Sequence, residues 1–150
     1  MIRSYKLFNS LTSILVMILC LYGCTSDPIK IVKNGILKFD SSITIGDAFD
    51  NYKFFESVSW EHFTTEQGRN VVQCIGKIKN TNYIIKTQFR ISKDDDTKFN
   101  ISYIGAWEGD EEIIKNLDYI ENIYSNSPID PALDSAIRFE NMLKNGKIPF

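Results

Sequence analysis

The chain has 150 residues, 43% of them hydrophobic, so it can bury one core but is short for two domains. Its 17 Lys and Arg residues nearly balance its 19 Asp and Glu residues, and no stretch concentrates the basic residues as a surface for a phosphate backbone would. The composition therefore argues against a nucleic acid partner.

Residues 1–23 have the pattern of a secretory signal peptide. Arg3 and Lys6 precede an unbroken apolar run over residues 14–22, and no acidic residue occurs in this part of the chain. A helix that spans a bilayer needs about 20 apolar residues, so this run is short for a membrane anchor. An uncleaved anchor is nevertheless one alternative.

The signal peptide ends in Leu21-Tyr22-Gly23-Cys24, which resembles the lipobox of bacterial lipoproteins. In that family a leucine lies three positions before the cysteine and a glycine directly before it; Tyr22 departs from the small or modest apolar residue that the family prefers. The resemblance implies that Cys24 becomes the N-terminus, carries lipid on its sulfur and anchors the protein in a membrane. Thr25, by similarity to Gram-negative sorting signals, implies the outer membrane, facing the periplasm. An ordinary cleavage site beside an unmodified Cys24 is the other alternative.

The first predicted elements after the signal peptide are a tether and a helix. Residues 24–34, which begin with the lipidated cysteine, show no helical periodicity and predict a tether to a single folded domain over 35–150. Thr44 and Asp47 approximate a capping box, and the apolar residues that follow align on one face of a helix over 45–55. The folded domain is thus predicted to begin with one helix.

Four antiparallel strands are predicted after this helix. The first begins at Ser57 and the second covers 71–78, and the turn residues over 66–70 predict a hairpin between them. The third and fourth strands alternate apolar and polar residues, as half-buried antiparallel strands do. The residues expected to share one face are Tyr83, Ile85, Thr87, Phe89 and Ile91 in the third strand, and Phe99, Ile101, Tyr103, Gly105 and Trp107 in the fourth.

Two helices complete the predicted order. The acids over 110–112 complement the partial charge of a helix N-terminus, and apolar residues between Ile113 and Ile123 form its buried stripe. Asp130 and Pro131 provide a cap and a first-turn proline for a second helix that ends near Gly146. The sequence therefore predicts an α+β fold with one helix, a four-stranded antiparallel meander, and two C-terminal helices packed on one sheet face.

A further resemblance covers about thirty residues. It is carried by Thr44-Ile45-Gly46-x-Ala48-Phe49-x-x-Tyr52, by Trp60-Glu61-x-Phe63 and by Gly68-Arg69-x-Val71-Val72. Together these are similar to a recurring pattern in small bacterial envelope lipoproteins of unassigned function. More loosely, the order of helix and sheet resembles barrel-assembly accessory lipoproteins and β-lactamase inhibitor proteins. These resemblances imply an envelope protein and assign no binding residue.

His62 is the only histidine, so any catalytic triad or Cys-His pair must use it. Cys74 in the next strand could approach His62 across the hairpin, and a thiolate beside an imidazole can be nucleophilic. The apolar neighbours of Cys74 favour instead a thiol packed in the core. With Cys20 in the signal peptide and Cys24 lipidated, Cys74 has no disulfide partner within the chain.

The acidic clusters do not predict a metal site. Asp94-Asp95-Asp96 could offer oxygens to calcium, but the loop lacks the ligand spacing of an EF-hand and is more simply a solvated turn. The acids over 110–112 are explained as residues of a helix start. The sequence therefore indicates no catalytic residue, metal or cofactor.

Aromatic residues are the remaining candidates for recognition. Their alternation places most of them on one sheet face, where helices would cover them, so a core role is favoured. Trp60 and Trp107 lie near strand ends, and together with Arg69 they are the candidate partner-binding surface.

These observations predict a lipid-anchored, non-enzymatic protein of the cell envelope that binds or supports another protein. One alternative is an inhibitor or exclusion factor that blocks an enzyme or receptor with a loop such as residues 66–70. The other is a hydrolase that uses His62 and Cys74.

Overall fold

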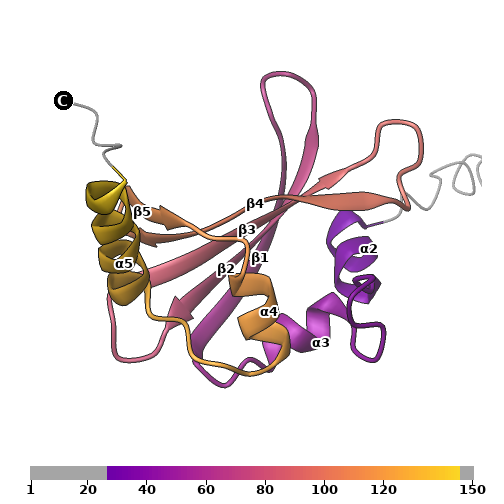
Figure 1. Ribbon diagram of the computed structural model, residues 1–150. Helices are drawn as coiled ribbons and strands as arrows, with labels where there is room; N and C mark the ends of the chain where they lie inside the picture. The colour runs from indigo at the N-terminus through magenta and orange to yellow at the C-terminus, as the bar shows by residue number, and fades with distance from the viewer. Residues whose placement is uncertain (1–26, 146–150) are drawn as a thin grey trace, which may run out of the picture.

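The computed structural model describes residues 27–145, which form one antiparallel sheet and four helices (Figure 1). The elements are α2 (Pro28–Asn34), α3 (Ile45–Asp50), β1 (Phe55–Thr64), β2 (Asn70–Ile78), β3 (Tyr83–Ile91), β4 (Phe99–Glu108), β5 (Glu111–Lys115), α4 (Tyr119–Tyr124) and α5 (Pro131–Lys144). The five strands lie in sequence order, each antiparallel to the next. The predicted α+β class and antiparallel meander are confirmed, with a fifth strand added. The signal peptide and Cys24 lie outside the described residues.

The core lies between one face of the sheet, here called the covered face, and helices α2, α3 and α4. Side chains of the covered face alternate along each strand, and Cys74, Thr87 and Ile104 are directly opposite one another on neighbouring strands. The buried residues of this face are Val72, Cys74, Ile85, Thr87, Phe89, Ile104, Ala106 and Ile114. Burial of each large apolar side chain stabilises the fold by about 1.5–3 kcal/mol.

Residues 28–34 form helix α2, although the sequence predicted a tether there. The Asp27 carboxylate accepts a hydrogen bond from the Ile29 backbone N–H at 3.0 Å, and Pro28 occupies the first turn. Val32 is completely buried in the core. The tether is therefore wrong for this stretch, and the folded part begins three residues after Cys24. A helix of two turns is too short to show periodicity in the sequence.

The helix predicted over 45–55 is α3, and it ends already at Asp50. Its start is as expected: the Asp47 backbone N–H donates to Thr44 Oγ1 at 3.1 Å, and Thr44 Oγ1 donates to the Asp47 carboxylate at 2.8 Å. Phe55 belongs to β1, and its ring lies over Gly76, where an added Cβ would be 2.3 Å from the ring. Close packing of Phe55 on the sheet thus stops the helix early.

The stretch 111–115 is strand β5, where the sequence predicted the start of a helix. Gly109 has a φ of 59°, in the left-handed region that glycine adopts without steric cost, and it lets β4 turn back directly into β5. Ile114 then packs on the covered face. Only residues 119–124 become helical, as α4, because hydrogen bonds to β4 replace the first turns of the expected helix.

Strand β4 contains a bulge that changes the expected faces. Gln88 pairs with Tyr103 and Phe89 pairs with Ile101, so Ser102 is an extra residue on β4. A shift of one residue moves all later side chains to the opposite face. The predicted single face of β4 is therefore wrong: Phe99 and Ile101 pack on the core, whereas the later residues Tyr103, Gly105 and Trp107 lie on the other face.

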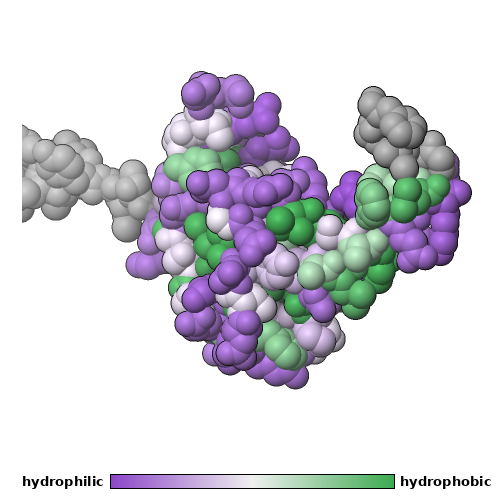
Figure 2. All heavy atoms as spheres, turned by 90° about the vertical axis from the view of Figure 1, so that its left-hand side faces the viewer, coloured by the Kyte–Doolittle hydropathy of each residue, from purple (hydrophilic) through white to green (hydrophobic). Residues whose placement is uncertain are grey.

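Helix α5 contributes little to the core. The Asp130 carboxylate accepts a hydrogen bond from the Leu133 backbone N–H at 3.1 Å, as the sequence predicted, but Pro131 is the one buried residue of this helix. Leu133 and Phe139 are each 55% exposed. Figure 2, seen from the side on which α5 lies, shows patches of hydrophobic residues on this surface. The expected packing of both C-terminal helices on the sheet is thus met in part: α4 contributes buried residues to the core, whereas α5 lies beside β5 and leaves its apolar side chains largely exposed.

Candidate binding site

The sheet face opposite the core carries an ordered set of polar and aromatic side chains, and we call it the open face. Strand pairing places one row of its residues in register across the sheet. The open face includes Glu61, Gln73, Ile84, Lys86, Gln88, Tyr103, Trp107, Glu112 and Lys115. Most of them are exposed or half-buried, so a partner can reach them.

Two glutamines and a glutamate form a hydrogen-bonded chain across β1, β2 and β3. Gln88 Nε2 donates to Gln73 Oε1 at 2.7 Å, and Gln73 Nε2 donates to Glu61 Oε1 at 2.5 Å. Gln73 is buried between its two neighbours. Because both amides are already held in one orientation, binding of a partner here would cost little side-chain conformational entropy.

An aromatic pair continues this row on β4. Trp107 Nε1 donates to Tyr103 Oη at 2.6 Å, and Tyr103 Oη donates to the Glu112 carboxylate on β5 at 2.7 Å. Gly105 makes this arrangement possible, because an added Cβ would lie 2.5 Å from Tyr103 Oη. Burial and the hydrogen bond to Glu112 raise the pKa of Tyr103, so its phenol stays a donor at neutral pH.

Two lysines lie over these aromatic rings. Lys86 Nζ is 3.9 Å from the centroid of the Trp107 ring, and Lys115 Nζ is 5.0 Å from the centroid of the Tyr103 ring. Such cation–π contacts hold the ammonium groups in place while leaving them able to donate hydrogen bonds. The open face therefore offers positioned cations, carboxylates and amides, which suit recognition of another polar surface.

The residues proposed for nucleophilic chemistry do not form a reactive pair. Cys74 lies opposite Trp60 and His62 lies opposite Val72, so the thiol and the imidazole are not directly opposed. Cys74 is completely buried, and this burial raises the pKa of its thiol. A thiol that stays protonated is a poor nucleophile, so the geometry gives the hydrolase alternative no support.

The Asp94–Asp96 turn is held by its own hydrogen bonds. The Asp95 carboxylate accepts from the Thr97 backbone N–H at 3.0 Å and pairs with Lys98 Nζ at 2.8 Å. The contact with Lys98, followed by those with Thr97, lowers the pKa of Asp95 to about 2. Within residues 27–145, no group of three or more His, Cys, Asp or Glu side chains is placed to hold a metal ion.

The three predicted partner-binding residues lie on three different parts of the sheet. Trp60 is on the covered face, where its Nε1 donates to the Asp50 carboxylate at 2.8 Å and its ring stacks on Phe89. Trp107 lies on the open face and Arg69 in the turn between β1 and β2. The sequence did not single out Gln73 and Gln88, although the polar residues Lys86, Gln88 and Arg90 already marked this face of β3.

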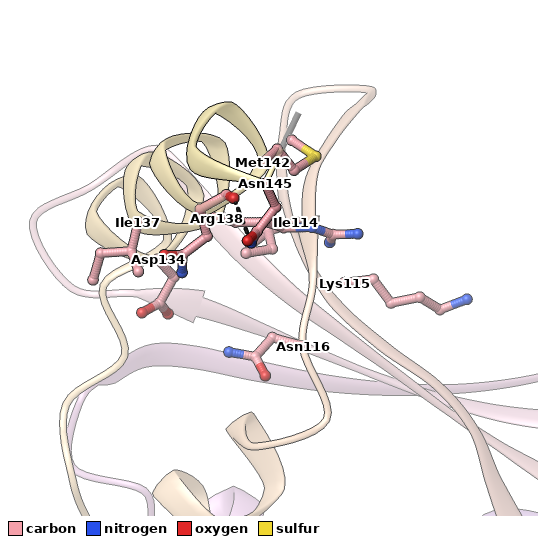
Figure 3. A pocket seen from close by; sticks show the side chains of 9 residues that line it. Ile114, Lys115, Asn116, Asp134, Ile137, Arg138, Met142 and Asn145 are labelled. Carbon is pink, nitrogen blue, oxygen red and sulfur yellow. Dashed lines mark hydrogen bonds between the residues drawn. The ribbon is translucent and has the colours of Figure 1, made fainter. Parts of the chain in front are cut away.

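A groove of about 510 Å³ separates α5 from β5 (Figure 3). The α5 side of the groove is mixed: Asp134, Arg138 and Asn141 line it together with the apolar residues Ile137 and Met142. Lys115 of β5 extends away from α5, whereas Ile114 lies beside Arg138 (Figure 3).

Comparison of the chain with protein-family models, with curated proteins and with solved structures found no match. Among residues 27–145, no helix combines the length and hydrophobicity that a bilayer span requires.

Proposed function

We propose that this protein is a lipid-anchored, non-enzymatic protein of the cell envelope whose open face binds another protein. The observation that supports binding most directly is the ordered row of polar and aromatic side chains across all five strands. Interface centres are enriched in tyrosine and tryptophan, and Tyr103 and Trp107 provide both. Their hydrogen bonds are already formed in the free protein, so binding would require little reordering.

The anchor in this proposal is Cys24, on the strength of the lipobox resemblance. Durable attachment takes more than one acyl chain, because a single chain binds a membrane only marginally. Two residues separate Cys24 from Asp27, where the folded part begins, and the three steps of extended chain from Cys24 to Asp27 reach at most about 10 Å. The domain would thus be held directly at the membrane surface, which we propose to be the periplasmic side of the outer membrane.

Photo-crosslinking in intact cells tests the proposed binding face. A photoreactive amino acid at Ile84, which lies opposite Trp107 on the open face, should give one defined adduct with an envelope protein. The matched control is the same probe at Leu117, which is 68% exposed and outside the open face. Equal adducts from both positions, or an adduct from Leu117 alone, would contradict a partner at the open face.

An inhibitor or exclusion factor is the second candidate function. The hairpin of β1 and β2 extends well beyond the rest of the sheet (Figure 1), and the residues of its turn, including Glu66 and Arg69, are exposed. A pull-down from solubilised envelope would favour this function if one enzyme copurified with the wild-type protein in a stoichiometric amount and did not copurify with the Arg69→Ala variant. Retention of that enzyme by Arg69→Ala, with loss on Trp107→Ala, would favour the open face instead.

A further inference from the structure

A cationic groove lies at the end of the sheet where the β1–β2 turn and the β3–β4 loop come together. It has a volume of about 370 Å³ and includes Arg69, Arg90, Lys93 and Asn100 in its lining. Asp94 is its one acidic lining residue, so the charge of the lining is positive. The groove combines two guanidinium groups, which are suited to bidentate recognition of an anion, with an ammonium group.

Strand register explains why these side chains converge. Arg90 of β3 lies between Val71 of β2 and Asn100 of β4, so Arg90 and Asn100 are neighbours on the open face. Arg69 precedes β2 by one residue and therefore joins them from the adjacent turn. Neither arginine forms an ion pair with another residue of the described part of the chain. Their charges are thus available to an external anion.

The position of α2 relates this groove to the proposed lipid anchor. The C-terminal end of α2 is close to the start of β4, because a Cβ added at Gly35 would lie 2.3 Å from the Phe99 ring. The described chain enters at α2 on the same side of the molecule as the β3–β4 loop (Figure 1). Helix α2 is only about 10 Å long, so lipid at Cys24 would place the groove near the membrane surface.

We propose that the cationic groove binds phosphate groups of membrane lipids and so orients the domain on its membrane. This inference rests on the proposed lipid anchor for its choice of ligand. Phosphate oxygens match the fork of an arginine side chain, and the local concentration of headgroups beside a tethered domain is high. Bound in this way, the end with both loops faces the bilayer, and most of the open face stays accessible from the side.

Vesicle sedimentation with the mature chain tests this proposal without the acyl chains. The chain over residues 24–150 with Cys24→Ser should bind phosphatidylglycerol vesicles at low salt, and Arg69→Gln/Arg90→Gln should weaken binding about tenfold or more. The charge-matched control is Lys77→Gln/Lys79→Gln, which removes one cation near the C-terminal end of β2 and one directly after it, and which should change binding less than threefold. Equal losses in the two variants, or no loss in the arginine variant, would overturn the proposal.

Competition distinguishes a phosphate site from other anion binding. Inorganic phosphate should displace the protein from the vesicles more strongly than chloride at the same ionic strength. Equal displacement would overturn recognition of phosphate, and stronger displacement by polyglutamate would assign the groove to an acidic protein segment. Because the assay lacks acyl chains, its failure would leave the anchor at Cys24 standing. Absence of lipid on the wild-type protein would refute the anchor and leave the measured phosphate binding intact.

Discussion

Gly105 shows at the scale of a single residue how the open face is built. The Tyr103 ring lies over this glycine and from there reaches both Trp107 and Glu112. Any side chain at this position would meet the phenol and also the Ile114 carbonyl oxygen, which an added Cβ would approach to 2.8 Å. The absence of a side chain therefore positions the aromatic pair.

Gly105→Ala is expected to lower the free energy of unfolding by about 1–3 kcal/mol, the usual cost of an overpacked site. The backbone oxygen cannot move aside as a flexible side chain would. The measurement is urea unfolding followed by tryptophan fluorescence. Gly68→Asn is the control, because nothing lies within 4 Å of an added Cβ there and asparagine tolerates its φ of 70°. An unchanged midpoint for Gly105→Ala would contradict the tight contact.

Asp95 is the residue through which pH should act on the β3–β4 loop. Its folded-state pKa of about 2 lies below the ordinary value of an aspartate, near 3.9. The stability that its ionised carboxylate contributes is therefore fully present above about pH 4 and is lost as the pH falls through about 2. Asp95→Asn should be less stable than wild type at pH 7, and this difference should shrink between pH 4 and pH 2.

Urea unfolding of both proteins at pH 7, 4 and 2.5 measures this difference. Glu108→Gln serves as the control, since it removes an exposed acid at the end of β4. A difference between wild type and Asp95→Asn that stays constant down to pH 2.5 would rule out the carboxylate as its source.

At the scale of elements, local signals predicted some segments well and others poorly. The cap of α3 at Thr44 and the alternating faces of β3 were predicted, because each depends on residues within a few positions of one another. The bulge at Ser102 was not predicted, because apolar and polar residues continue to alternate through it in the sequence. It becomes visible only in the pairing of β4 with Gln88 and Phe89 of β3. For this reason the sequence placed Tyr103 on the same face as Phe99 and Ile101, which pack on the core.

Helix α2 should be required for the stability of the fold, because its residue Val32 is completely buried in the core. Val32→Ala removes two buried methyl groups and should lower the free energy of unfolding by about 2 kcal/mol. Ile36→Ala is the matched control, because Ile36 follows the helix and is 55% exposed. Chemical denaturation of both variants measures the difference. Equal free energies of unfolding for Val32→Ala and Ile36→Ala would mean that α2 contributes nothing to the stability of the fold, which is the behaviour expected of a tether.

Across the whole molecule, the two faces of the sheet differ in how they are packed. The covered face packs against α2, α3 and α4, whereas most of the hydrogen-bonded side chains of the open face are half-buried or exposed. In our proposal the anchor enters at α2, so the same helix that closes the core also holds the domain near the membrane. The candidate site thus depends on strands that span residues 61–115, and no short motif contains it.

Cys24→Ser tests the anchor. Wild-type protein from cells fed with labelled palmitate should carry the label and sediment with membranes, because its acyl chains bury many methylene groups in the bilayer. The variant should carry no label. Thr25→Ser is the control, since it leaves the cysteine intact. Equal labelling of wild type and Cys24→Ser, or no label in either, would contradict lipidation at this position.

Local sequence patterns were enough to predict the alternating strand β3, the caps of α3 and α5 and the α+β class, and they raised the lipobox hypothesis. These features need only hydrogen bonds and side-chain periods within a few residues. Long-range contacts made residues 28–34 helical, paired residues 111–115 with β4 and turned Tyr103 away from the core. Each of these outcomes depends on burial or pairing with residues far along the chain, which override weak local preferences.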